Sequence, residues 1–413
     1  MIIPYLRQST AAHNEVRWQK TIKEKSIPEL RRHIISGSQA RWVKRKFQFH
    51  ILKLVIKHFG LTKKTFSVLD KLIEKQKFVH GPNVFNKWVK ASGKYYYYQY
   101  APAFPSLQMD QVILDELNRI EQVTTDKRLL RSAFFAITKK CPLQCEHCFE
   151  WDNINKKEIL SYEDLRTVIL KLMEAGITQL YISGGEPMLR VNEIVSLAHE
   201  FSNRIEIWVL TSGFNCSENN IRKLKISGVR GLVVSLDHYE REKHDRFRNH
   251  TGSYNDALLA IKSARELDMP VAISLCATKQ FCTKEHLNRY LELAHQLDVS
   301  FIQLLEPKAV GHYTNKDVTL DETQIKMLTE FYEGVSISPI REKYPLVVYH
   351  GYYQRRIGCF SAGNRSLYVD TSGNVTPCPF CQCTSGNLLK EPVLEIISTM
   401  KQRGCSSFDS AVL

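Results

Sequence analysis

The chain has 413 residues, 43% of them hydrophobic, and carries a net charge of +14. That length suffices for two or three domains, and the composition is ordinary for a globular protein with a large core. No secretory signal opens the sequence, and no run approaches the roughly 18 to 20 apolar residues of a membrane-spanning helix, so we expect a cytoplasmic protein rather than a secreted or membrane-spanning one.

The positive charge is concentrated near the N-terminus. Residues 1–94 hold 21 Lys and Arg against 5 Asp and Glu, a net of +16, whereas the remainder holds 36 against 38, a net of −2. We therefore expect an acidic partner for this segment: membrane phosphates, nucleic acid or an acidic peptide. Nucleic acid is the least favoured, because the sequence carries no recognisable RNA-binding module.

Residues 1–94 are expected to be mainly helical, and the run 41–60 is the most informative. Its apolar side chains recur at helical spacing, and Gly60 is suited to end the helix. These side chains are Phe47, Ile51, Leu54, Val55 and Phe59. Two interpretations stay open. Either this stripe lies on an anionic membrane, which makes the protein peripheral at the membrane, or it packs on the rest of the protein with its lysines in water.

Residues 95–130 are expected to connect this segment to the next domain. The run Tyr95–Tyr100 favours extended structure, and Pro102 and Pro105 bound a loop after it. We expect this stretch to pack on the following domain rather than to line an entrance. A helix is expected over 110–122.

From residue 133 the chain alternates between strand and helix patterns. Ser161–Asp164 is typical of a capping box that opens a helix, and Gly176 of the end of that helix. Further helices are expected over 253–268 and 283–298. This alternation implies parallel strands with right-handed crossovers. The six expected strands are 133–138, 178–182, 205–210, 231–236, 270–276 and 300–305.

Three cysteines, Cys141, Cys145 and Cys148, are separated by three and then two residues. A run this short can present three thiolates to one inorganic core, and thiolates suit soft metals and iron–sulfur clusters. Three ligands leave one iron of a [4Fe–4S] cluster open to another molecule, whereas a fourth would complete a cluster or a structural zinc site. A zinc knuckle and reduced core cysteines are the alternatives.

Together with Phe149, this run resembles the C-x3-C-x2-C-aromatic signature of the radical S-adenosylmethionine (SAM) superfamily. The resemblance continues in the same order with Ser183–Pro187, which contains the family's Gly-Gly-Glu-Pro motif, and with Ser235–Asp237. It implies an α/β fold, a partial (β/α)6 barrel over residues 131–335, with its chemistry at the C-terminal ends of the strands.

The resemblance also implies the cofactors. Cys141, Cys145 and Cys148 would hold a [4Fe–4S] cluster whose open iron is chelated by SAM, and an electron from the cluster would cleave SAM to a radical that takes hydrogen from the substrate. The implied SAM-binding residues are Phe149, Gly184, Gly185, Glu186, Pro187, Thr211, Ser235 and Arg248. Loop capping or surface solvation is the alternative role for Thr211, Ser235 and Arg248. The acid, base or radical-quenching residue is not identified; the candidates by position alone are Asp237, His238, Tyr239, Cys276 and Glu306.

Residues 336–413 contain a second group of cysteines. The run Tyr368–Cys378 predicts two short strands around a Ser-Gly-Asn turn, which would bring Cys378 back towards Cys359. Gly373, followed by Cys378 after four intervening residues, resembles the start of SPASM or Twitch domains and implies one auxiliary [4Fe–4S] cluster. Its expected ligands are Cys359, Cys378, Cys381 and Cys383, and Cys405 is the alternative to one of the last two. A four-thiolate zinc site is the competing interpretation.

These features predict a radical SAM enzyme with an auxiliary cluster, a basic N-terminal segment and an undetermined substrate: a peptide or protein side chain, a lipid or a small molecule. A reductant such as flavodoxin or ferredoxin is the expected partner. Two rivals remain. One is a non-catalytic iron–sulfur protein, and the other is an RNA-modifying radical SAM enzyme that uses residues 1–94 as a phosphate clamp.

Overall fold

A sheet of ten strands organises the computed structural model, which describes residues 33–80, 86–121, 130–337, 341–405 and 407–409. The strand order is β10-β9-β8-β7-β6-β5-β4-β11-β12-β13. Neighbouring strands from β10 to β11 are parallel, and β12 and β13 add antiparallel pairs. The strands are β4 Ser132–Ala136, β5 Gln179–Ser183, β6 Glu206–Thr211, β7 Gly231–Ser235, β8 Val271–Cys276, β9 Phe301–Leu305, β10 Leu346–Tyr349, β11 Ser366–Val369, β12 Asn374–Thr376 and β13 Gly386–Asn387.

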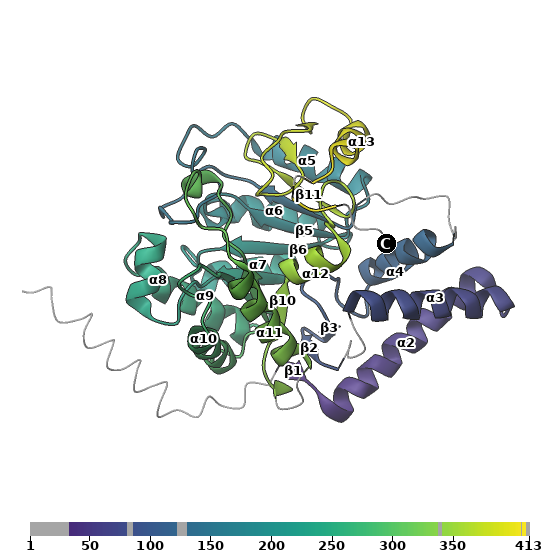
Figure 1. Cartoon of the computed structure of the whole chain (residues 1–413). Coiled ribbons are helices and arrows are strands. Elements are labelled where there is room, and N and C mark those ends of the chain that lie inside the picture. Colours follow the sequence, from purple (N-terminus) through teal and green to yellow (C-terminus); the bar gives the residue numbers. More distant parts are fainter. Residues whose placement is uncertain (1–32, 81–85, 122–129, 338–340, 406, 410–413) are drawn as a thin grey trace, which may run out of the picture. The chain divides into compact units, whose positions relative to one another are not determined.

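Helices connect the successive parallel strands and pack beside the sheet (Figure 1). The predicted capping box is present: the Ser161 hydroxyl accepts from the Asp164 backbone N–H, and the Asp164 carboxylate accepts from the Ser161 backbone N–H. None of the described helices is long and apolar enough to cross a membrane. The helices and 3-10 turns are α5 Tyr162–Glu174, η1 Pro187–Arg190, α6 Val191–Phe201, α7 Glu218–Ser227, α8 Arg241–Arg248, α9 Ser253–Glu266, α10 Lys284–Gln296, η2 Gly311–Tyr313, α11 Glu322–Ile337, α12 His350–Ile357 and α13 Val393–Arg403.

The six predicted core strands are confirmed as β4 to β9, so the core is a partial barrel of parallel β/α units. The sheet continues beyond them on both sides. β10 pairs with β9 through Leu346 to Tyr349, and β11 pairs with the other edge strand, β4. β10, which follows the boundary expected after residue 335, thus extends the parallel sheet and gives the backbone groups at the edge of β9 a partner.

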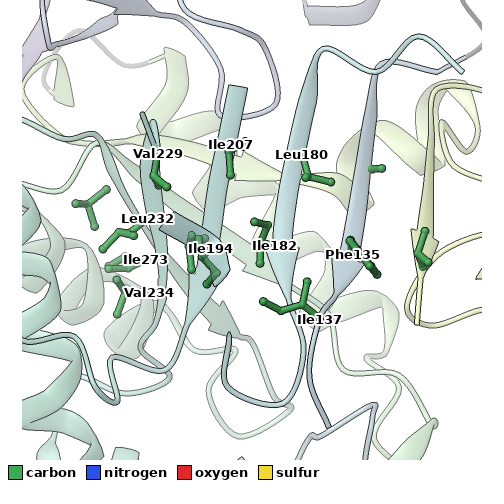
Figure 2. Close-up of a cluster of buried hydrophobic side chains, with 14 of the residues drawn as sticks. Phe135, Ile137, Leu180, Ile182, Ile194, Ile207, Val229, Leu232, Val234 and Ile273 are labelled. Carbon is green, nitrogen blue, oxygen red and sulfur yellow. The ribbon is translucent and has the colours of Figure 1, made fainter. Parts of the chain in front are cut away.

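The two faces of the sheet build two different cores. Side chains that alternate along the strands pack outwards against the helices, and Figure 2 shows part of this layer. It includes Phe135, Leu180, Ile182, Ile207, Leu232, Val234 and Ile273, with Ile194 of α6 among them. The intervening positions face the other way and form a separate cluster with the N-terminal segment: Tyr181, Trp208, Val233, Ala272, Phe301 and Val348. This period-two alternation is what a strand covered on both faces requires.

The N-terminal segment forms a small unit of its own secondary structure. Its elements are β1 Ile34–Ile35, α2 Gly37–Phe59, α3 Lys63–His80, β2 Trp88–Ala91, β3 Lys94–Tyr96 and α4 Leu107–Ile120. β1, β2 and β3 make an antiparallel sheet. The predicted helices over 41–60 and 110–122 are thus present as α2 and α4, and residues 1–32 of the segment lie outside the described part.

The apolar stripe of α2 packs inside the protein. Phe47 and Val55 are buried in a hydrophobic cluster with residues of α3, α4 and β2, and Ile51, Leu54 and Phe59 pack against the same cluster. Of the two interpretations of this stripe, the structure therefore supports packing. Phe47 and Val55 are too deeply buried to reach a membrane, whereas Ile51, Leu54 and Phe59 are only half-buried.

The tyrosine-rich stretch after β2 closes one end of the barrel interior, as the packing interpretation expected. Tyr96 is buried against Trp208, with ring centroids 6.3 Å apart, and Tyr100 lies 5.0 Å from the Tyr181 ring. The backbone N–H of Ala103 donates to the buried Glu206 carboxylate at 2.9 Å, at the start of β6. The N-terminal segment is therefore part of the barrel core and not an appendage.

A pair of neighbouring phenylalanines tests this packing. Phe47 is 3% exposed and contacts the rings of Trp88, Tyr97 and Phe104, whereas Phe49 is 58% exposed. We expect Phe47→Ala to lower the free energy of unfolding by about 3–5 kcal/mol because it leaves a cavity. The control Phe49→Ala should change it by less than about 0.5 kcal/mol, as exposed sites usually do. Urea denaturation followed by circular dichroism measures both, and equal effects would contradict the packing of α2.

Candidate active site

The polar motifs meet in one cavity at the C-terminal ends of the parallel strands. The cavity has a volume of about 640 Å³ and is lined by residues that follow β4, β5, β6, β7, β8 and β9. Every predicted SAM-binding residue lines it except Pro187, which is buried at the start of η1. The convergence of motifs from distant parts of the chain is therefore confirmed by the fold.

The loop after β4 presents its three thiols to this cavity: Cys141, Cys145 and Cys148. Burial raises the pKa of Cys141 and Cys148 to about 12, and burial also raises the pKa of Cys145. Neutral thiols are thus favoured until a cation is bound, and a bound metal deprotonates the thiol that ligates it. Three soft donors on one short loop, facing one cavity, fit an iron–sulfur cluster with an open coordination position.

Two glycines after β5 pack directly against this loop. A Cβ at Gly185 would lie 2.3 Å from the Lys140 carbonyl oxygen and 3.0 Å from Cys141 Cβ, and one at Gly184 would lie 2.8 Å from the Thr138 oxygen. The Gly185 N–H donates to that Thr138 oxygen at 2.7 Å. Both glycines are therefore needed for contact between two strand ends of the protein itself, a role that the sequence motif alone does not reveal.

Glu186 ties the loops after β5 and β6 together. Its buried carboxylate accepts hydrogen bonds from the Thr211 hydroxyl and from the backbone N–H of Ser212, each at 2.8 Å, and from the Met188 N–H at 3.0 Å. Burial raises the pKa of Glu186, while these hydrogen bonds oppose that shift. Thr211 therefore lines the cavity and donates to Glu186. Ser235, at the end of β7, lines the cavity as well.

Arg248 lies against the cysteine loop from the opposite side. Its Nε donates to the Asp237 carboxylate at 2.7 Å, and its Nη1 donates to Cys145 Sγ at 3.5 Å. Burial alone would raise the pKa of Asp237, but Arg248, with His147, His244 and the Cys276 backbone N–H, outweighs burial and holds the pKa below its usual value. Asp237, a candidate acid or base by position, is therefore an ionised partner that holds Arg248 beside Cys145.

The loop after β9 also holds the cysteine loop in place, through Gly311 and His312. This contact was not identified from the sequence. The His312 N–H donates to the Cys148 carbonyl at 2.9 Å, and its Nδ1 lies 3.0 Å from the Cys145 carbonyl oxygen. The His312 ring stacks on Trp151 with centroids 3.8 Å apart, and a Cβ at Gly311 would lie 2.3 Å from the Cys148 oxygen. No motif marks this loop, and only the fold brings it and the cysteines to the same cavity.

The other residues proposed by position occupy different places. Cys276 and Glu306 line the cavity, and Glu306 is bonded by Arg355 at 2.7 and 2.8 Å and by the Tyr349 hydroxyl at 2.7 Å. Burial would raise the pKa of Glu306, but Lys308, Arg355 and Tyr349 lower it further than burial raises it. His238 and Tyr239 instead pack with Phe281 and His286.

The C-terminal cysteines also face this cavity. The predicted hairpin is present as β11 and β12, and Cys359, Cys378, Cys381 and Cys405 all line the cavity. Cys405 hydrogen-bonds to Cys359, and burial together with this neighbour raises the pKa of Cys359 to about 11. Cys383, predicted as a ligand, is exposed. Within the described residues no three His, Cys, Asp or Glu side chains meet around a single-ion position.

Comparison with known proteins agrees with this geometry. The radical SAM superfamily domain matches residues 135–283. The AdoMet-dependent heme synthase of Methanosarcina barkeri is 25% identical over 282 residues, which cover 63% of this chain and 80% of that protein. The PqqA peptide cyclase of Granulibacter bethesdensis is 24% identical over 260 residues, which cover 60% of this chain and 68% of the relative.

Solved structures show the same fold. Streptococcus suis SuiB bound to S-adenosylmethionine superposes with a TM-score of 0.55 at 14% identity, over 84% of this chain and 80% of SuiB. Native anSMEcpe with bound AdoMet superposes with a TM-score of 0.52 at 16% identity, over 66% of this chain and 82% of that one. By the domain match, residues 135–283 form a radical SAM domain, and enzymes of this superfamily use a [4Fe–4S] cluster and S-adenosylmethionine.

Proposed function

We propose that this enzyme abstracts hydrogen from a peptide or protein side chain bound between two iron–sulfur clusters. The observation that carries the proposal is the single cavity lined by Cys141, Cys145 and Cys148 on one side and by the C-terminal cysteines on the other. The radical SAM cluster and SAM supply the 5′-deoxyadenosyl radical. A cavity of about 640 Å³ between the two groups leaves room for SAM and a substrate side chain.

The chain's own residues hold and shield these groups. Cys141, Cys145 and Cys148 ligate the first cluster, and Ser235 and the backbone around Gly184 bind SAM. Arg248 provides a buried positive charge beside Cys145, which opposes the rise in the pKa of this thiol that burial causes. The Phe149 ring, which packs against Tyr368 and Phe380 of the C-terminal domain, keeps water from the cavity wall.

The auxiliary cluster is proposed to use Cys405 in place of Cys383. Cys359, Cys378, Cys381 and Cys405 line the cavity in two hydrogen-bonded pairs, whereas Cys383 is exposed to solvent. The close spacing of Cys381 and Cys383 along the chain is the reason that sequence alone favours both. The backbone bridge between Cys378 and Cys381 supports Cys381 as the ligand that accompanies Cys378. A zinc ion on the same four thiols is the competing interpretation.

A peptide substrate is favoured by the relatives. The matched PqqA peptide cyclase is named for a peptide substrate, and one SuiB structure contains the precursor peptide SuiA. The heme synthase relative keeps a small-molecule substrate as the second candidate. A reductant such as flavodoxin or ferredoxin and an anionic partner for the basic N-terminal segment complete the proposal. Comparing peptides and metabolites between wild-type and deletion strains distinguishes the two substrate classes.

The radical cluster gives the first functional test. We expect Cys145→Ala to abolish formation of 5′-deoxyadenosine from SAM under dithionite, because two thiolates cannot hold a cluster with one open iron in place. Cys282→Ala is the matched control, since this cysteine is buried outside the cavity lining, its thiol donates to the Ala277 carbonyl, and the variant should retain full SAM cleavage. Chromatography of the nucleoside products measures both. Normal 5′-deoxyadenosine formation by the Cys145 variant would overturn the assignment of this thiol as a cluster ligand. No 5′-deoxyadenosine from the wild type would favour a non-catalytic iron–sulfur protein.

The C-terminal ligand set is tested by metal content. Two [4Fe–4S] clusters predict about eight irons per chain after anaerobic reconstitution. Cys405→Ala should lower this towards about four, whereas Cys383→Ala should leave it near eight. Elemental analysis and Mössbauer spectroscopy read out the result. If Cys383→Ala lost iron, Cys383 would be a ligand of the auxiliary cluster, as the sequence predicted. One zinc with about four irons per chain would instead make the C-terminal site a structural zinc site.

A further inference from the structure

The outward side of α2 carries aromatic and basic residues in alternation. Trp42, Lys46, Phe49 and Lys53 follow one another by four, three and four positions, so they share one side of the helix. We call them the outer stripe. Trp42 is 56% exposed and Phe49 is 58% exposed. Lys46 Nζ lies 5.2 Å from the Trp42 ring, and Lys53 Nζ lies 4.6 Å from the Phe49 ring.

The orientation of the outer stripe is fixed by the rest of α2. Val43, Phe47 and Val55 are buried in the N-terminal hydrophobic cluster, so the helix cannot turn the stripe inwards without emptying that core. The aromatic residues of the stripe therefore stay in contact with solvent. Two large exposed aromatic side chains on one helix face are a feature of interaction surfaces rather than of ordinary solvent-facing helices.

The helix α3 and the turn before it also carry exposed apolar side chains and basic residues. Leu61, in the turn between α2 and α3, is 79% exposed, and Phe66 of α3 is also exposed. Residues 37–80 contain 11 Lys and Arg against 2 Asp and Glu. The hairpin of α2 and α3 thus combines a strong positive charge with exposed aromatic and aliphatic side chains.

We propose that the hairpin of α2 and α3 docks the enzyme on an anionic lipid bilayer. This identifies the anionic partner included in the proposed function, and it does not depend on the radical chemistry. Lysines near such a surface are attracted to its phosphates, while Trp and Phe rings settle at the headgroup level. The outer stripe supplies both kinds of contact, in place of the buried stripe that the sequence suggested.

The shape and chemistry of the hairpin favour a bilayer over other polyanions. Single-stranded nucleic acids are held in grooves where bases stack on aromatic rings. The outer stripe instead lies on the convex side of a helix, and Leu61 offers no ring for stacking. A bilayer has an apolar layer beneath its charged headgroups. It can therefore contact the convex side of α2 and the aliphatic side chain of Leu61 at the same time.

Docking would also place the cavity near the bilayer. Val79, at the end of α3, lines the cavity, and the Arg356 guanidinium donates to the Val79 and Phe78 carbonyls at 3.4 and 3.2 Å. The hairpin is therefore joined to α12 by direct hydrogen bonds, and its own Val79 forms part of the cavity wall. A substrate presented at the membrane surface would have a short path to the cavity.

Vesicle co-sedimentation of the full-length chain tests the proposal. We expect binding to phosphatidylcholine vesicles that contain phosphatidylserine and none to phosphatidylcholine alone. Lys46→Glu/Lys53→Glu should weaken partitioning by about 30-fold or more, because each lysine at the surface contributes about 1 kcal/mol and tenfold corresponds to about 1.4 kcal/mol. The matched control is Lys223→Glu/Lys284→Glu, which reverses two exposed lysines on α7 and α10 and should bind as the wild type does.

A second variant separates the aromatic contribution. Trp42→Ala/Phe49→Ala should lose the part of the binding that survives about 1 M salt, where charges are screened beyond ~3 Å. All variants should form 5′-deoxyadenosine at the wild-type rate, so failure of docking and failure of the radical chemistry are seen separately. The proposal is overturned if wild type ignores both vesicle types, if the Lys46/Lys53 variant binds undiminished, or if single-stranded RNA or polyglutamate is bound while anionic vesicles are not.

Discussion

The structure depends most on close backbone contacts with the loop that carries Cys141, Cys145 and Cys148. On one side Gly185 leaves no room for a Cβ against Lys140, and on another Gly311 leaves none against Cys148. The end of α8 completes the enclosure, since the Phe247 and Arg248 carbonyls accept from backbone N–H groups of the loop. Three elements that are far apart in the chain thus give the loop one shape, and that shape turns all three thiols towards one cavity.

Three carboxylates around the cavity have bonding partners within the protein. Glu186 accepts hydrogen bonds from the loop after β6, Asp237 pairs with Arg248, and Glu306 pairs with Arg355. Each carboxylate is thereby held in one geometry. An uncompensated charge in such a site would be expensive to bury, so these pairs permit a water-poor cavity in which a reactive radical is protected. They also explain why position alone did not identify an acid or base.

The N-terminal segment contributes to the barrel as well as to the surface. Tyr96 and Tyr100 fill the end of the barrel opposite the cysteines, and Ala103 is anchored on Glu206. Tyr98 and Tyr100 also line the cavity, so the segment forms part of its floor. The same segment turns its basic and aromatic residues outwards on α2. Its two faces therefore serve stability and interaction separately, which is the usual division on an amphipathic helix.

Much of this protein was determined by sequence alone. The six core strands, the capping box at Ser161 and the spacing of the first three cysteines are local patterns, because alternation, capping and metal-ligand spacing depend on residues close together in the chain. The resemblance of three motifs in one order then led to the correct superfamily and its cofactors. The fold follows from these features, since parallel β/α units have few topologies available to them.

Tertiary structure decided the rest. Only packing shows that Phe47 is buried while Phe49 is exposed, that Glu186 bonds Thr211, and that Cys405 rather than Cys383 faces Cys359. The clamp of His312 on the cysteine loop is likewise invisible in the sequence. The physical reason is common to all four. Periodicity reports which side chains share a face, but which face is covered, and by what, depends on contacts between segments that only the folded chain brings together.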